Sequence, residues 1–356
     1  MSRRVPLMLP RLTPSPTAIA DASAAHVAED MRYRFGGPVH RASQVLDGNQ
    51  LRKLSLTLGR RMLYPGLDVT KRAPPDGTPL PPGYHLVYFT PNGVESDLGR
   101  DGGDVTFNAP ASFGRRVWAG GRVWYGDKEA ALRVGDEVEE HTRFLDAVPK
   151  ASSDGTEMVL TRVEKQFWGP RGLAVVDERN WIFRHETALD TPKRQVLVNK
   201  ALSSSVVIDK PRNETYPDRY IRWSPTSLFR FSALTFNAHR IHYDQAWTAT
   251  EEGHWNCVVH GPLTLINMLD YWRDHCGRNK HLKEITYRAV APIYTGQQSK
   301  MSAKKVGFMG QNADINDKTP KSNWEIVVST MVLDREKTCM TASIVAAGLN
   351  GVPAKR

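Results

Sequence analysis

Four side chains that can hold, orient or transfer a proton lie close together in the second half of the chain. They are Asn237, His239, His242 and Asp244. An imidazole can move protons near neutral pH. Farther along, His260 and Gly261 stand at the predicted start of a helix, where unpaired backbone N–H groups stabilise negative charge on a carbonyl oxygen. A base beside such donors is what removal of a proton next to a carbonyl requires.

The helix that would position Gly261 is predicted to run from Gly261 to Cys276. Pro262 suits its first turn, where a missing N–H costs nothing. Apolar residues recur at helical spacing, at Leu263, Ile266, Leu269, Tyr271 and Trp272. The polar residues between them are expected to face outward, namely Asn267, Asp270, Arg273 and Asp274.

Strand patterns fill much of both halves of the chain. Alternating apolar and polar residues, bounded by Gly, Pro, Asn and Asp, occur over 105–185 and again over 220–347. A faint internal repeat connects the two regions, because the turn at 132–136 recurs at 293–297 and strands follow each turn in the same order. Gly135 and Gly296 are expected to adopt a positive φ in these turns. The chain is therefore predicted to be α+β, with a curled antiparallel sheet around one buried helix in the second half.

The stretch over 231–263 resembles a known family. The matching residues are Phe231, Leu234, Thr235, Ile241, His242 and Asp244, followed by His260 and Gly261 before the helix. The family is that of the MaoC-type, (R)-specific enoyl-thioester hydratases and dehydratases, which have a hotdog fold. The variant motif resembles the subgroup that contains fungal mitochondrial 3-hydroxyacyl-thioester dehydratase type 2 and bacterial mesaconyl-C4-CoA hydratase. The segments 116–121 and 132–136 resemble the N-terminal half of that subgroup.

This resemblance implies a tandem double hotdog, in which two halves of one chain act as a pseudo-dimer and cover each other's edge strands. We expect an N-terminal extension over 1–50, a first hotdog over 51–190, a linker over 191–219 and a catalytic hotdog over 220–350. The first hotdog lacks the motif, so we expect it to complete the sheet and shape an acyl tunnel. Four tryptophans are expected in its core, namely Trp118, Trp124, Trp168 and Trp181. A homodimer of whole chains stays open.

The resemblance also assigns roles to residues of this sequence. His242 corresponds to the catalytic histidine, and the Gly261 N–H is expected to hold the thioester oxygen as enolate charge develops. The catalytic aspartate of the family falls on Asn237, whose carboxamide can orient a water or hydroxyl group but cannot act as a base. The supporting candidates are Asp244, His239 and His260. Arg240 is either a solvated charge or a contact for coenzyme phosphate or an acidic carrier protein.

The implied activity is that of a hydro-lyase, a (3R)-hydroxyacyl-thioester dehydratase or enoyl-thioester hydratase. Its substrate would be an acyl thioester of acyl carrier protein or of coenzyme A, and its setting mitochondrial fatty acid synthesis. It would need no metal and no redox cofactor. Three alternatives stay open: a coenzyme A hydratase of a dicarboxylic or specialised substrate, a hotdog thioesterase, and a non-catalytic acyl-binding subunit.

Composition excludes several other classes of protein. The 356 residues carry a net charge of +10, yet their Lys and Arg are scattered, so nucleic-acid binding is not expected. No apolar run approaches the roughly 18 residues of a membrane span. Three cysteines without a CxxC pair predict neither a disulfide framework nor a zinc site. The P-loop, GxGxxG, HExxH and GxSxG motifs are also absent from the sequence.

The start of the chain resembles a mitochondrial transit peptide. It contains Arg3, Arg4 and Arg11 and no acidic residue before Asp21. We therefore expect the protein in the mitochondrial matrix. The cytoplasm is the alternative, because prolines in the same stretch disfavour an amphipathic helix.

Overall fold

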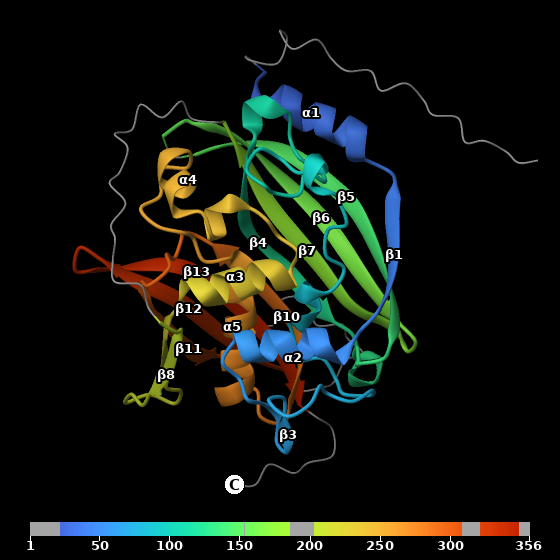
Figure 1. The fold of residues 1–356 in the computed structure, drawn as a ribbon, viewed down its shortest axis with the longest axis vertical. Helices are drawn as coiled ribbons and strands as arrows, with labels where there is room; N and C mark the ends of the chain where they lie inside the picture. The colour runs from blue at the N-terminus through green and yellow to red at the C-terminus, as the bar shows by residue number, and fades with distance from the viewer. Residues whose placement is uncertain (1–21, 153, 186–202, 308–320, 349–356) are drawn as a thin grey trace, which may run out of the picture.

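The computed structural model describes residues 22–152, 154–185, 203–307 and 321–348. Within these ranges, eleven antiparallel strands form one sheet in the order β1-β5-β6-β7-β4-β10-β13-β12-β11-β9-β8 (Figure 1). The N-terminal half contributes β1 (Val39–Val45), β4 (Arg115–Tyr125), β5 (Glu137–Ala151), β6 (Glu157–Gly169) and β7 (Gly172–Arg184). The C-terminal half contributes β8 (Val206–Lys210), β9 (Asp218–Arg222), β10 (Lys280–Ala289), β11 (Gln298–Val306), β12 (Lys321–Val332) and β13 (Arg335–Gly348). A separate ribbon pairs β2 (Met62–Tyr64) with β3 (Leu67–Asp68).

The two halves repeat the same strand order, which explains the internal repeat in the sequence. The order β5-β6-β7-β4 of the first half corresponds to β11-β12-β13-β10 of the second. The halves meet where β4 pairs antiparallel with β10, with Val123 opposite Ile285. Gly135 and Gly296 have φ values of 86° and 78°, as predicted for the two turns. The predicted tandem α+β arrangement is confirmed, and the β4–β10 pairing covers an edge that each half would otherwise expose.

The helices lie mainly around the second half (Figure 1). They are α1 (Ala24–Phe35), α2 (Gly48–Thr57), α3 (Pro225–Leu234), α4 (Gln245–Thr250) and α5 (Gly261–His275). Short 3₁₀ turns are η2 (Tyr84–Val87), η3 (Glu95–Asp97), η4 (Ala111–Phe113), η5 (Lys128–Ala130) and η6 (Arg240–His242). None of the helices in the described part of the chain combines the length and apolar character needed to cross a membrane.

Each half contains a similar short unit of strand, capping residue and helix near its start. After β1, Asp47 caps α2 by accepting a hydrogen bond from the N–H of Gln50. After β9, Ser224 caps α3 in the same way through the N–H of Ser227. In the second half the chain then continues to a long helix, α5. In the first half, the segment between α2 and β4 forms the β2–β3 ribbon and 3₁₀ turns instead.

The observed elements do not follow the expected boundaries at every point. The expected end of the N-terminal extension, at residue 50, lies inside α2, and β1 already pairs with β5. Strand β8 and the start of β9 lie within the expected linker over 191–219, and β9 pairs with β11. Residues 191–202 of that linker lie outside the described part of the chain, as do residues 1–21 with the expected transit peptide.

Helix α5 confirms the predicted span, with Cys276 as its C-terminal cap. Every residue from Leu263 to Trp272 is buried, so the helix is enclosed on all sides. The expectation that its polar residues face outward is therefore wrong, since Asn267 and Asp270 are only 5% and 2% exposed. The physical reason is that the first half packs over the face of α5 that the sheet leaves uncovered.

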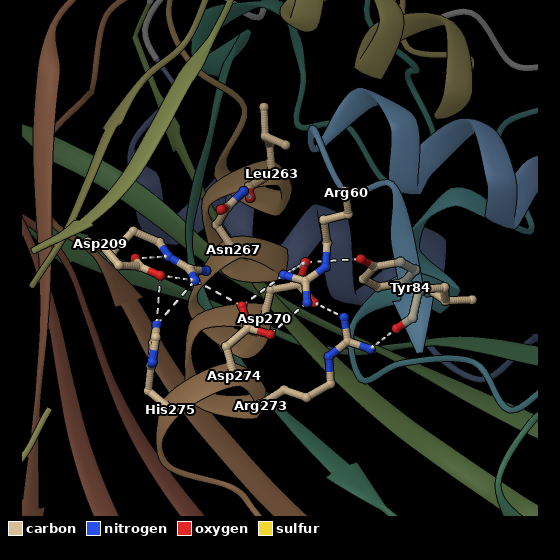
Figure 2. Close-up of polar contacts among 11 residues, drawn as sticks. Arg60, Tyr84, Asp209, Leu263, Asn267, Asp270, Arg273, Asp274 and His275 are labelled. Carbon is tan, nitrogen blue, oxygen red and sulfur yellow. Dashed lines mark hydrogen bonds and ion pairs between the residues drawn. The ribbon is translucent and has the colours of Figure 1, made fainter. Parts of the chain in front are cut away.

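Charged groups from both halves satisfy the polar face of α5 (Figure 2). Asp270 accepts hydrogen bonds from the Tyr84 hydroxyl, at 3.0 Å, and from the Arg273 guanidinium, at 2.8 Å. Asp274 binds Arg60 of the first half, with N–O distances of 2.6 and 2.8 Å. Buried carboxylates are tolerated only with such partners. The network therefore joins the N-terminal half to the helix that carries the candidate site.

The first half has its own apolar cluster beneath α1. Met31 of α1 packs with Phe144, Val163 and Phe183 of the strands that it covers. Of the four tryptophans predicted for the core, Trp181 packs against this cluster and Trp118 against the larger one. The prediction is wrong for Trp124 and Trp168, which are 37% and 40% exposed.

Candidate active site

A cavity of about 510 Å³ lies where the two halves meet. Its walls come from β4 and β7 of the first half, from the turn over 237–242 and from the N-terminal end of α5. Five of the predicted site residues line it directly: Asn237, His239, His242, His260 and Gly261. Residues from both halves thus line the cavity that contains the predicted motif.

His242 is held as a neutral base. Its Nδ1 lies 2.8 Å from the carbonyl oxygen of Val258, and because a carbonyl can only accept, Nδ1 carries the proton. Its Nε2 therefore holds a lone pair. Burial, assisted by the neighbouring His239, lowers the pKa of His242 to about 3. The imidazole is consequently unprotonated at neutral pH and able to accept a proton.

The His242 ring lies at the opening of α5. It stacks on the His260 ring with a centroid distance of 3.5 Å, and His260 is the residue directly before the helix. The His260 Nε2 is 2.9 Å from the Ser232 hydroxyl, and burial lowers its pKa well below the usual value. A Cβ at Gly261 would come within 3.1 Å of the Trp118 ring, so glycine lets this ring approach the start of the helix closely. The N–H of Gly261, in the first turn, has no helical partner.

Asn237 and His239 form the wall beside His242. The Asn237 Oδ1 accepts a hydrogen bond of 3.1 Å from the His239 backbone N–H, which fixes the turn. Phe236, just before it, has a φ of 47°, a left-handed conformation that turns the chain sharply. The His239 ring is 5.5 Å from that of His242. A carboxamide and two imidazoles therefore face the same space.

Comparison with known proteins identifies the chain. The family model for hydroxyacyl-thioester dehydratase type 2 matches residues 83–295, which include every cavity wall named above. The chain belongs to this family. Membership confirms the predicted class of enzyme, a hydro-lyase of the hydroxyacyl-thioester dehydratase or hydratase type.

Two relatives show the extent of the likeness in sequence. A protein of Chloroflexus aurantiacus named mesaconyl-C(4)-CoA hydratase is 32% identical over 233 residues, 64% of this chain and 76% of the relative. A protein of Schizosaccharomyces pombe named mitochondrial hydroxyacyl-thioester dehydratase type 2 is 26% identical over 259 residues, 69% of this chain and 84% of the relative.

Solved structures agree in fold with this dehydratase-family chain. HtdX of Mycobacterium tuberculosis has a TM-score of 0.51 at 10% identity, over 86% of this chain and 99% of HtdX. A MaoC domain dehydratase of Chloroflexus aurantiacus has a TM-score of 0.54 at 12% identity, over 92% and 99%. At identities this low, the structural similarity supports the fold alone. The predicted double-hotdog fold is confirmed.

Two predicted site residues of this family member lie outside the cavity. Asp244 caps α4 by accepting from the N–H of Trp247 at 2.9 Å, and its other oxygen binds the Arg240 guanidinium at 2.7 Å. Asp244 therefore does not line the cavity, and its two oxygens are used in the α4 cap and in the Arg240 ion pair. Arg240, whose side chain is 40% exposed, forms this ion pair.

Sequence reasoning missed the polar residues that the first half brings to the cavity. The Arg116 guanidinium lies 4.9 Å from the centre of the Trp181 ring and donates to the Thr106 carbonyl at 3.1 Å. Asp101 also lines the cavity. These residues lie more than 100 positions before the motif, and only the alternation of Arg116 and Trp118 along one strand could have marked this wall.

The described residues form no evident metal-binding site. Among the described residues, no group of three or more His, Cys, Asp or Glu side chains has the geometry to hold an ion. The three cysteines are free thiols and buried.

Proposed function

We propose that this protein interconverts a (3R)-hydroxyacyl thioester and the corresponding enoyl thioester by removing or adding water, with His242 as the base. The observation that supports this most strongly is the placement of the His242 imidazole. Its Nδ1 donates to Val258, its Nε2 holds a lone pair, and its ring stacks on the residue that opens α5.

In the dehydration direction, Nε2 of His242 takes the proton from Cα. The electron pair that this leaves moves onto the thioester oxygen, which accepts a hydrogen bond from the Gly261 N–H at the positive end of the helix. Asn237 orients the β-hydroxyl by hydrogen bonding. As the enolate pair returns to form the Cα–Cβ double bond, the Cβ–O bond breaks and the hydroxide leaves as water, with the proton that His242 took. Hydration is the same path in reverse, so substrate supply decides the direction.

The thioester is carried by coenzyme A or by acyl carrier protein in this proposal. The positive net charge of +10 suits either, because both carriers are anionic. Comparing crotonyl groups on the two carriers by kcat/KM decides between them. A ratio near one would contradict any specialisation for a single carrier.

Replacing His242 by Ala tests the assignment of the base. We expect kcat for hydration of crotonyl-CoA, followed by loss of enoyl absorbance, to fall by about 10²- to 10⁴-fold, the usual contribution of a positioned general base. The exposed His26 of α1, replaced by Ala, is the matched control and should leave the rate unchanged. Wild-type turnover by the His242→Ala protein would show that another group is the base.

We further propose that the protein acts in the mitochondrial matrix, in fatty acid synthesis. The relative from Schizosaccharomyces pombe is named as mitochondrial, and the basic, acid-free start of this chain agrees with import. Imaging of the full chain with a C-terminal fluorescent tag tests this. A diffuse cytoplasmic signal would contradict it.

A further inference from the structure

A carboxylate from the first half lines the cavity beside the motif histidines. Asp101, in the loop between η3 and η4, lines the cavity with His239 and His242. Its Oδ2 lies 3.3 Å from Nε2 of His239, close enough for an ion pair, although the two do not form a hydrogen bond in this geometry. The His239 ring in turn is 5.5 Å from the His242 ring. A carboxylate and two imidazoles thus follow one another along the cavity wall.

The Asp101 loop is fixed against the motif by its backbone. The carbonyl oxygen of Asp101 accepts a hydrogen bond of 2.8 Å from the N–H of Arg240. Gly102 has a φ of 74°, and a Cβ there would lie 2.3 Å from the Ala238 carbonyl oxygen, so only glycine allows this approach. The Asp101 Oδ1 accepts from the Gly103 N–H at 2.8 Å. Oδ1 therefore holds the loop, and Oδ2 is the oxygen left for His239.

We propose that Asp101 is a positioning residue that acts through His239 and makes it the second proton-transfer group of the reaction. This inference rests on the function proposed above. Water addition requires one group that takes a proton from water and one that exchanges a proton at Cα. Asn237 cannot take a proton, because a carboxamide is not a base. His239 is the imidazole beside it that has a carboxylate partner.

Asp101 would set the tautomer of His239. Nε2 of His239 has no hydrogen-bond partner in this geometry and lies 3.3 Å from Oδ2. A small rotation of the ring would bring its proton onto Oδ2 and leave the lone pair on Nδ1. An aspartate that holds an imidazole in one tautomer and stabilises its protonated form is a known general device in acid–base catalysis.

In hydration, an O–H bond of water breaks and its proton goes to Nδ1 of His239. The water oxygen bonds to Cβ, and the π pair of the double bond moves onto the thioester oxygen at Gly261. The proton then passes from His239 to Nε2 of His242 through a bridging water and on to Cα, where the C–H bond forms as the enolate collapses. Both imidazoles end neutral, and one water has added across the double bond.

A protonated His239 would be unfavourable in this environment without a compensating charge. Burial, then the charge of Arg116 and the nearby His254, lowers the pKa of His239 to about 3. A transient imidazolium in such a site needs a fixed negative charge beside it. Asp101 supplies that charge from 3.3 Å. The competing explanation is that Asp101 merely balances Arg116, in which case its removal would disturb folding or binding rather than turnover.

Asp101→Asn separates these explanations, because asparagine keeps an oxygen to accept from Gly103 and loses only the charge. We expect kcat for hydration of crotonyl-CoA to fall about 10²-fold, with KM and the thermal midpoint near their wild-type values. Asp97→Asn removes an exposed carboxylate of the preceding 3₁₀ turn, η3, and serves as the matched control, with kcat unchanged.

A double variant tests whether Asp101 acts through His239. If it does, Asp101→Asn combined with His239→Gln should lose no more activity than His239→Gln alone. Losses that multiply, or wild-type kcat in Asp101→Asn, would overturn the inference while leaving the proposed function intact. A fall in thermal midpoint with a raised KM and normal kcat would favour the purely structural role. Wild-type protein that does not hydrate crotonyl-CoA would remove the proposed function and this inference together.

Discussion

Three of the histidines that line the cavity, His239, His242 and His260, are kept neutral by the same physical cause. Burial is the largest influence lowering the pKa of each, and their mutual proximity adds to it for His242 and His260. An imidazole that is neutral at pH 7 can accept a proton without first losing one. The cavity therefore holds its base in the reactive form, at a cost in stability under acid conditions.

Acid should destabilise the protein from about pH 6.5 downward. The unfolded chain binds protons at these histidines near their ordinary pKa of about 6.5, while the folded protein does not bind them until near pH 3 for His239 and His242. Stability is therefore fully present above that range and is lost as pH falls through it, by up to about 1.4 kcal/mol per pH unit for each histidine. Urea unfolding between pH 8 and pH 4 measures this slope.

The variant His260→Gln removes one titrating group and should flatten the slope between pH 6.5 and pH 4. The paired carboxylate of Asp274, whose pKa is lowered to about 2, titrates only at lower pH and does not enter this window. A free energy of unfolding that stays constant down to pH 4 would show that the histidines are not held neutral.

At the scale of elements, α5 is both the centre of the core and the support of the site. Its N-terminal end faces the cavity, and its polar face is paired to Arg60 and Tyr84 of the first half (Figure 2). These contacts fix the position of the helix end and with it the Gly261 N–H. Removing one partner from such a buried pair leaves the other charges uncompensated.

The variant Asp270→Ala should therefore lower the free energy of unfolding by about 3–5 kcal/mol. It leaves Arg273 without its carboxylate at 2.8 Å and the buried Tyr84 hydroxyl without its acceptor. Urea unfolding at pH 7 measures the change. The control is Asp30→Ala, which removes an exposed i,i+4 partner of Arg34 and should cost less than about 1 kcal/mol. Equal losses in both variants would contradict the stabilising role of the network.

At the scale of the whole molecule, the two halves form one structural unit. They share the β4–β10 pairing and the larger apolar cluster, which includes Leu51 and Leu54 of α2 and Leu263 and Leu269 of α5. The cavity also takes walls from both halves. The half without the motif therefore completes the core and the candidate site as well as the sheet.

Separated halves should not be active. A fragment of residues 203–356 exposes the edge of β10 and the polar face of α5, so we expect no cooperative thermal unfolding and no hydration of crotonyl-CoA. Co-expression with residues 1–202 should restore both. A soluble, active homodimer of the second fragment alone would contradict the requirement for the first half.

The sequence by itself determined the elements whose patterns are local. The 261–276 helix, the paired strand runs and the glycine turns at 135 and 296 follow from short-range periodicity and backbone sterics. The spacing of Asn237, His239 and His242 also sufficed to locate the turn that lines the cavity. Such features need no knowledge of what packs against them.

Only the tertiary structure decided which faces are buried and which distant residues meet. Asp270 looked solvent-exposed because helical spacing does not show that Arg60 and Tyr84 cover it from more than 180 positions away. Asp101 reaches His239 through a loop fold that no local pattern encodes. Which distant charged and apolar residues meet depends on the complete fold. The candidate site is therefore formed only by the two halves together.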